Sequence, residues 1–452
     1  MRGGPRPGPP PALPSRPRAS RARSVTSGRP YRNAILRAVD APSGRRAADL
    51  DPEVGPASSS PWWFGAPFGC GREGLTLDGR SLAAVAGRHG TPLYVYSRAA
   101  VRAQVAALRR VLATLEAETR VHYALKANRC PGLLEVLRAE GGLGIDACSP
   151  REVEVARAAG FAAGEISVTA CMPSNRDLDA FVAQGVHVNL DSLSALRRYG
   201  ARAPKGTAVG LRVDCGIEVG YGCDPKLVYG NGKFGLQPDA FDEAAATARA
   251  AGLVVTTLHV HCGWGLRMED GPQMEWIFTR MAELAHRLPG VEVVNVGGGL
   301  GVRRQAADRP LSLAAWADLL RRHLTPAVRT IACEPGTLLV DRAGVLVVEV
   351  NTVERRGGTT WVGVDAGHNV NVYMAHYGIP IEIVHLARPL DPVEASYAVA
   401  GNINESNDVF ARAALLPRIQ EGDLLAMLPA GAYGASMASE HCLRGPAPEV
   451  VV

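Results

Sequence analysis

The sequence predicts an α/β protein in which a (β/α)8 barrel is followed by a smaller, mostly-β domain. Three observations lead to this prediction. From about residue 68, short apolar runs alternate with Ala-, Leu- and Arg-rich stretches of helical period, as expected for parallel βα units. The runs continue to about residue 340, in roughly the number that closes an eight-stranded barrel. Beyond that point strand-like sequence with turns replaces the helical pattern.

The individual elements follow in chain order. The strand–helix alternation starts with the run TPLYVYS and continues through TRVHYALKAN, GLGIDACS, EISVTA, HVNLDS, AVGLRVD, VVTTLHVHCG, VEVVNVGGG and TIACEPG. Strand candidates of the second domain are GVLVVEVNTVERR, TTWVGVDAG, SYAVAGN and GDLLAMLPAGAYG. We therefore expect a disordered Pro/Arg-rich extension at 1–67, a strand segment at 68–95 that pairs with the C-terminal domain, the barrel at 96–340, and the β domain at 341–452.

Composition excludes several classes of function. Residues 1–39 contain nine Arg and no acidic residue, which leaves 40 basic and 44 acidic residues elsewhere and no basic stripe for nucleic acid. That Arg-rich start is similar to a transit peptide, although an upstream mis-assigned start codon fits equally well. No run approaches the roughly 18 apolar residues of a membrane span. Nine Cys without paired or zinc-like spacing predict free thiols in a reducing cytoplasm and no metal site.

Lysine is unusually scarce, with four Lys against 45 Arg. A lysine that survives such a bias is a candidate for chemistry that needs an amine, because a guanidinium cannot form a Schiff base. Lys126 follows the apolar run VHYAL, where the carboxyl ends of barrel strands form the active-site face. A surface lysine is the alternative interpretation. We predict that Lys126 forms a Schiff base; a carbonyl cofactor such as pyridoxal phosphate (PLP) would need this amine on a rigid element.

Further polar groups follow other strand candidates. In VNVGGGLG, three glycines after an apolar strand allow the backbone to wrap a phosphate. His259 and His261 share one face of a strand, where most histidines are structural. Glu334 in CEPGT could keep a pyridine nitrogen protonated, as decarboxylation requires, or could cap a helix.

The motifs HYALKAN, LHVHCGWG, VNVGGGLG, CEPGT and PAGAYGASMAS occur in the order found in the fold-type III PLP-dependent decarboxylases, on an alanine racemase-like barrel. The chain resembles the diaminopimelate decarboxylase branch over about residues 75–452. The resemblance implies a PLP Schiff base on Lys126, His261 against the ring, and Glu334 beside the ring nitrogen. It also implies a homodimer with composite active sites. Other residues implied as cofactor contacts are Gly297, Gly298, Gly299, Gly336 and Tyr433, the last supplied to the neighbouring subunit; Asp146, Arg212, Lys233 and Phe234 are implied as supporting residues.

Departures from the family pattern concern the substrate. Asn404 stands where the family has the cysteine that reaches across the dimer and donates a proton, and Trp264 stands where a Ser is common. Thr337 and Tyr373 replace two arginines that grip the distal carboxylate of diaminopimelate. We expect the substrate to contact Thr337, Tyr373, Tyr377, Asn404 and Glu405, with His368 and His376 as further neutral groups.

The leading hypothesis is therefore a cytoplasmic PLP-dependent carboxy-lyase that acts on an amino acid other than meso-diaminopimelate. The substrate could be modified or carrier-linked, as in antibiotic or siderophore biosynthesis. Three alternatives stay open: diaminopimelate decarboxylase itself, an amino-acid racemase or epimerase, and a catalytically silent regulatory homologue. The lost arginines favour the leading hypothesis, because charge-assisted bonds contribute about 1.5 to 3 kcal/mol each.

Overall fold

The computed structural model describes residues 60–221 and 229–452. Most of the extension predicted to be disordered, residues 1–59, lies outside the described residues. The remainder of that prediction, residues 60–67, is wrong. Trp63 is only 3% exposed, and the Trp62 indole N–H donates to the Glu382 carboxylate at 2.8 Å. Consecutive aromatic side chains therefore anchor this segment, although its neighbours are rich in Pro and Ser.

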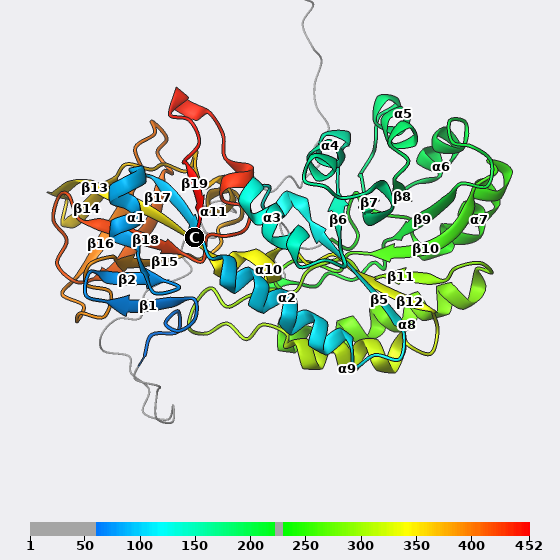
Figure 1. Cartoon of the computed structure of the whole chain (residues 1–452), viewed down its shortest axis with the longest axis horizontal. Coiled ribbons are helices and arrows are strands. Elements are labelled where there is room, and N and C mark those ends of the chain that lie inside the picture. Colours follow the sequence, from blue (N-terminus) through cyan, green and yellow to red (C-terminus); the bar gives the residue numbers. More distant parts are fainter. Residues whose placement is uncertain (1–59, 222–228) are drawn as a thin grey trace, which may run out of the picture. The chain divides into compact units, whose positions relative to one another are not determined.

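Eight parallel strands form a closed barrel, which confirms the predicted fold class (Figure 1). Strand β12 pairs with β5 and closes the ring, with Cys333 opposite Val121. Strand β6 is buried along its whole length, as expected for a parallel strand covered on both faces. The barrel strands are β5 (Glu118–Ala124), β6 (Leu143–Ala147), β7 (Ile166–Val168), β8 (His187–Leu190), β9 (Ala208–Val213), β10 (Val254–Val260), β11 (Val293–Asn295) and β12 (Thr330–Cys333).

Helices surround this ring of strands (Figure 1). Several of them begin after a serine whose hydroxyl accepts a backbone N–H of the first turn, which stabilises the helix start; these N-caps are Ser97, Ser149, Ser174, Ser192 and Ser312. None of the helices in the described residues has both the length and the apolar character to cross a bilayer. The helices are α2 (Arg98–Leu112), α3 (Pro131–Ala139), α4 (Pro150–Ala158), α5 (Asn175–Gln184), α6 (Leu193–Gly200), α7 (Phe241–Ala250), α8 (Gly271–Arg287), α9 (Leu313–His323) and α10 (Thr337–Val340).

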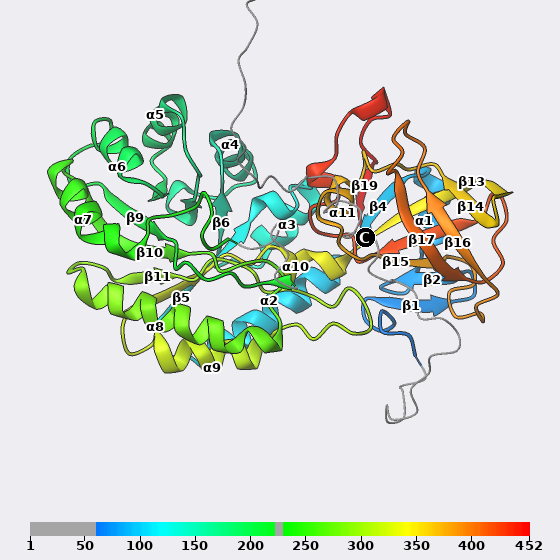
Figure 2. The ribbon, with the colours of Figure 1, turned by 180° about the vertical axis from the view of Figure 1, so that it is seen from behind.

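The C-terminal part forms an eight-stranded sheet, as predicted for a mostly-β domain. Figure 2 shows β14, β16 and β17 side by side, in agreement with their pairing. The run TPLYVYS belongs to this sheet and not to the barrel, because its strand β4 pairs antiparallel with β13. The sheet consists of β4 (Leu93–Tyr96), β13 (Gly344–Arg356), β14 (Thr359–Val364), β15 (Glu382–His385), β16 (Ala395–Ala400), β17 (Val409–Leu416), β18 (Leu424–Leu428) and β19 (Glu449–Val451); helix α11 (Val372–Tyr377) lies between β14 and β15.

The first described elements pack on this sheet. Strands β1 (Phe68–Gly71), β2 (Gly74–Leu77) and β3 (Arg80–Ser81) form a small antiparallel sheet that precedes α1 (Leu82–His89). The Leu75 N–H donates to the Leu386 carbonyl at 2.7 Å. A second apolar core joins these elements to the C-terminal sheet through buried residues such as Leu77 and Val345. The N-terminal segment is thus part of the C-terminal domain's core.

Candidate active site

A cavity of about 260 Å³ lies at the carboxyl ends of the barrel strands. Its volume is close to the lower end of the roughly 300–1,000 Å³ range of ligand pockets. The lining includes the predicted residues Lys126, Asp146, Arg212, His261, Gly298, Gly299, Glu334, Gly336, Thr337 and Tyr433, together with Ala124, Cys148, Thr169, Cys171, Tyr229, Phe234, His259 and Trp264.

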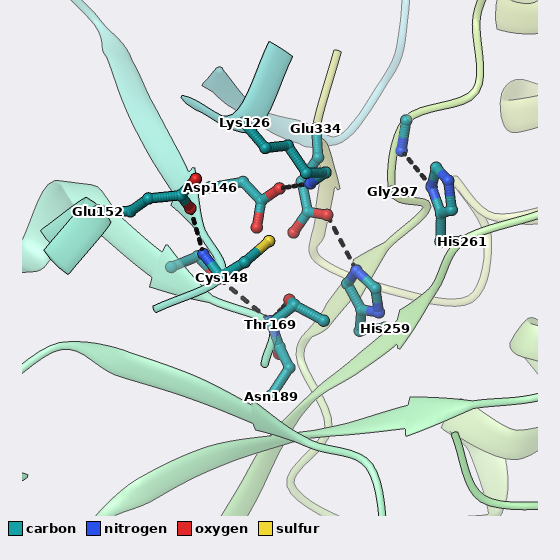
Figure 3. A network of polar contacts seen from close by, with 12 residues as sticks. Lys126, Asp146, Cys148, Glu152, Thr169, Asn189, His259, His261, Gly297 and Glu334 are labelled. Atoms are coloured by element: carbon teal, nitrogen blue, oxygen red, sulfur yellow. Dashed lines mark hydrogen bonds and ion pairs between the residues drawn. The ribbon is translucent and has the colours of Figure 1, made fainter. Parts of the chain in front are cut away.

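Lys126 projects into this cavity directly after β5. Its amine lies 2.5 Å from the buried Asp146 carboxylate, while 40% of the lysine side chain stays exposed (Figure 3). Burial lowers the pKa of Lys126, but Asp146 and other acidic groups outweigh burial, so the pKa lies well above its ordinary value. Burial and repulsion from Glu334 raise the pKa of Asp146 to about 7, against the pull of Lys126. Asp146 does not cap the next helix, because Ser149 does.

Glu334 is held from two sides in the interior, and Figure 3 shows one of these contacts, with His259. His259 contacts one carboxylate oxygen at 3.0 Å, and the Asn295 amide donates to the other at 2.7 Å. Burial raises the pKa of Glu334, but the contact with His259 and the positive charge of Lys126 outweigh burial and hold the pKa below its ordinary value. Glu334 is therefore a fixed anion at the cavity wall, and not a helix cap or a surface residue.

His261 and the glycine turn lie next to each other. The Gly298 N–H donates to Nδ1 of His261 at 3.1 Å, so the ring carries its proton on the other nitrogen. Burial and the nearby cations Arg212 and Lys126 hold the pKa of His261 well below its ordinary value, which keeps the ring neutral. A neutral flat ring suits contact with an aromatic cofactor.

The residues present fit PLP, the cofactor that the family resemblance implies. A Cβ on Gly298 would lie 2.6 Å from the Glu334 carbonyl oxygen, and one on Gly299, at φ +97°, would lie 2.5 Å from that of Gly263. Only glycine allows such a close backbone turn, which leaves space for a phosphate. Asp146 Oδ1 and His259 Nδ1 are two of the buried side-chain atoms that have no hydrogen-bond partner in the described part of the chain. Both side chains line the cavity, where a polar ligand would satisfy them.

One wall of the cavity is neutral and aromatic. Trp264 donates its indole N–H to the Thr337 hydroxyl at 3.2 Å, so the two residues predicted to alter the substrate site touch each other. Tyr373 packs against Trp264 and Tyr433, with ring centroids 6.0 and 4.9 Å apart. Tyr373 and its neighbour Tyr377 lie behind this wall and are not among the residues that line the cavity. Their predicted contact with substrate is indirect in a single chain.

Tyr433 requires a correction. The expectation that it serves the neighbouring subunit is wrong for this arrangement, because it lines the cavity of its own chain. Its N–H donates to the Ala127 carbonyl at 2.7 Å, and the Ser436 hydroxyl donates to the Lys126 carbonyl at 2.8 Å. These bonds fix the tyrosine segment beside the lysine.

Asn404 and Glu405 do not line the cavity of their own chain. Both are exposed, and Glu405 contacts His441 at 2.8 Å. His368 also points elsewhere, since its ring packs edge-on against Phe410. Exposed placement of the 404–405 segment is compatible with a role at a partner's site, but within one chain these residues are separate from Lys126.

Two cysteines that line the cavity were not identified from the sequence. Cys148 follows β6, and Cys171 follows β7, both on the face that already contains Lys126. The rule that singled out Lys126, a reactive side chain just after a barrel strand, would have found them. A third feature had no local signal: the buried Arg304 guanidinium donates to Asp341 at 2.7 Å, 37 positions along the chain.

Comparisons with known proteins agree with this geometry. Residues 98–341 match the family model described as the pyridoxal binding domain of pyridoxal-dependent decarboxylases. The chain is 34% identical over 391 residues to a diaminopimelate decarboxylase from Methanothermobacter thermautotrophicus, covering 84% of this chain and 90% of that one. It is 33% identical over 402 residues to the enzyme of that name from Streptomyces coelicolor, covering 83% and 88%. The crystal structure of diaminopimelate decarboxylase from M. jannaschii with L-lysine is similar at a TM-score of 0.76 and 26% identity, over 86% and 93% of the chains.

Proposed function

We propose that this chain, which belongs to the pyridoxal-dependent decarboxylases and uses pyridoxal phosphate, removes one α-carboxylate of meso-diaminopimelate. The main support for this substrate is the similarity, over 84% of the chain, to an enzyme named for that reaction. The relatives thus favour the diaminopimelate alternative over our leading expectation of another substrate. They also support decarboxylation over racemisation.

Bound PLP supplies an electron sink for the electrons left behind when CO2 departs. Lys126 is the amine that holds it, and Asp146 positions that amine at 2.5 Å. Glu334 presents a fixed negative charge, which favours a protonated ring nitrogen. His261 offers a neutral ring face, and the turn at 297–299 offers space for the phosphate. Each role rests on placement around one cavity.

A second candidate substrate is an amino acid without a distal carboxylate, modified or carrier-linked. The contact between Trp264 and Thr337 favours it, because neither side chain offers a guanidinium for a carboxylate, and the Arg304 guanidinium nearby is paired with Asp341. A panel of purified amino acids separates the two candidates, with CO2 and the amine product measured by mass spectrometry. Release of CO2 from meso-diaminopimelate with formation of lysine supports the first; release only from amino acids with neutral side chains contradicts it.

Thr337→Arg tests the same wall. If Thr337 limits recognition of the distal carboxylate, the arginine should raise kcat/KM for meso-diaminopimelate by roughly tenfold or more, the equivalent of one charge-assisted bond of about 1.5 kcal/mol. Thr337→Val, which removes the hydrogen bond from Trp264 without adding charge, is the matched control. Equal kcat/KM in the arginine variant and its parent would show that the distal carboxylate does not approach residue 337.

We propose further that the enzyme is a homodimer in which the segment at 404–405 completes the partner's site. The exposure of Asn404 and Glu405 supports this, as does their separation from the cavity of their own chain. Lys126→Ala and Glu405→Ala variants, each inactive alone, should then regain activity when unfolded and refolded together. Random pairing gives one intact site in about half of the dimers, or about a quarter of all sites. No recovery, with each parent refolding alone to its dimer, would contradict composite sites.

A further inference from the structure

The catalytic cavity contains a thiol to which the roles assigned so far give no task. Cys148 lines the cavity together with Lys126 and Asp146. In Figure 3 its side chain extends from the end of β6 on the side where Asp146 and Lys126 lie. Its backbone N–H donates to the Glu152 carboxylate at 2.6 Å, and helix α4 starts at the next residue but one. The backbone that carries the thiol is therefore fixed, and the thiol lines the same cavity as the reactive amine.

Decarboxylation needs an acid at this place. When the bond between the α-carbon and the carboxylate breaks, the electron pair stays behind and CO2 leaves without a proton. The carbon must then form a new C–H bond. An acid that delivers this proton has to line the cavity and carry its proton at neutral pH.

The Tyr433 phenol lines the cavity and burial raises its pKa, so it meets both conditions and is the main rival of Cys148; Tyr433→Phe tests it in the exchange assay that tests Cys148. Glu334 is held ionised and can only accept. Asn404 has no acidic proton and is exposed outside the cavity. The Cys171 thiol is directed at the Lys233 carbonyl, with sulfur and oxygen 3.7 Å apart. Lys126 is the group that holds the cofactor. Within the described residues, the sulfur of Cys148 makes no hydrogen bond.

We propose that Cys148 donates the proton that the α-carbon receives after CO2 has left. The S–H bond breaks as the C–H bond forms, and the resulting thiolate is reprotonated by the Lys126 ammonium or by water. Burial raises the pKa of the Cys148 thiol to about 12, so the proton is present at neutral pH. Lys126 acts in the opposite direction on that pKa and stabilises the thiolate formed by the transfer. A thiol within the subunit thus takes over the function for which Asn404 is unsuited.

The inference rests on the decarboxylase assignment but not on the choice of substrate. Its test uses the amine product of whichever amino acid releases CO2 in the panel. In D2O the loaded enzyme should exchange hydrogen at the carbon that lost CO2, because this exchange is the reverse of proton delivery. Cys148→Ala should slow that exchange by about 10²- to 10⁴-fold, the usual range for a positioned acid. In a single turnover the same variant should still release CO2 while amine formation lags.

Three measurements keep the outcome clear. Absorbance of the PLP–lysine imine at about 420 nm should persist in Cys148→Ala and Cys148→Ser, which shows that the site is intact. Alkylation by iodoacetamide, which requires the thiolate, should modify Cys148 in cofactor-free protein slowly and faster as the pH rises, and less so after PLP is added, as mapped by peptide mass. Cys70→Ser, an exposed cysteine outside the cavity, should exchange at the parent rate. Parent-rate exchange in Cys148→Ala, or loss of exchange in Cys171→Ser or Tyr433→Phe instead, would overturn the proposal. Absence of CO2 from every amino acid would instead contradict the proposed function.

Discussion

Replacing Lys126 by Ala should eliminate the PLP–lysine absorbance at about 420 nm. It should also slow decarboxylation by about 10²- to 10⁴-fold or more. The amine enters the cavity on a short turn fixed from both sides. Asp146 contacts the nitrogen at 2.5 Å, and the Ser436 hydroxyl bonds to the Lys126 carbonyl at 2.8 Å. Lys126→Arg should fail equally, because a guanidinium keeps the positive charge but cannot form the covalent bond. This comparison separates the loss of an amine from the loss of a charge.

Lys205 provides the matched control for this prediction. It is exposed, and its amine donates to the Ala251 carbonyl at 2.8 Å, outside the cavity. Lys205→Ala should keep both the absorbance and the activity. Borohydride reduction followed by peptide mass analysis should place PLP on the peptide that contains Lys126. A reduced adduct on any other lysine, or an unchanged spectrum of Lys126→Ala, would refute the assignment.

The barrel could be predicted because each strand leaves a local pattern. A short apolar run followed by a helical stretch needs no knowledge of distant residues, and side chains just after such runs share one face. Lys126 and Glu334 were noticed in this way, whereas the family resemblance singled out His261; the structure brings all three to one cavity. The same pattern placed the run TPLYVYS at the start of the strand–helix alternation, since a strand buried along its whole length looks alike in a barrel and in a sheet core. Most of its strand β4 lies in the 68–95 segment that was expected to pair with the C-terminal domain, and β4 does pair with β13.

The remaining features depend on contacts between distant parts of the chain. Trp63 is buried by the C-terminal sheet, and nothing in the Pro- and Ser-rich sequence around it indicates that partner. Tyr433 was assigned to the wrong subunit, because a sequence motif indicates that a residue contacts the site but does not indicate which subunit supplies that residue. The pairing of Arg304 with Asp341 has no periodicity or spacing that would reveal it.

Replacing Arg304 by Met should lower the free energy of unfolding by about 3 to 5 kcal/mol, the usual cost of removing one partner of a buried ion pair. The Arg304 and Asp341 side chains are 2% and 0% exposed. Asp341 also accepts the Ala432 N–H at 3.2 Å, immediately before Tyr433. The Arg304 guanidinium lies 5.8 Å from the Trp264 ring centroid and 5.6 Å from that of Tyr373. The pair thus supports the aromatic wall and the segment that carries Tyr433.

The decrease in the free energy of unfolding of Arg304→Met should depend on pH. Urea unfolding of the variant and the parent at pH 5 and pH 8 measures this dependence. Burial raises the pKa of Asp341, and Arg304 opposes this effect, so removing Arg304 raises the pKa further. An acid whose pKa is raised in the folded state makes the fold less stable as pH rises above its unfolded value of about 3.9. The deficit of Arg304→Met should therefore be larger at pH 8. Adding Asp341→Asn removes the unpaired charge while keeping an acceptor for Ala432, and should restore most of the loss. An equal deficit at both pH values, or no rescue in the double variant, would show that Arg304 stabilises the protein by packing and not by charge.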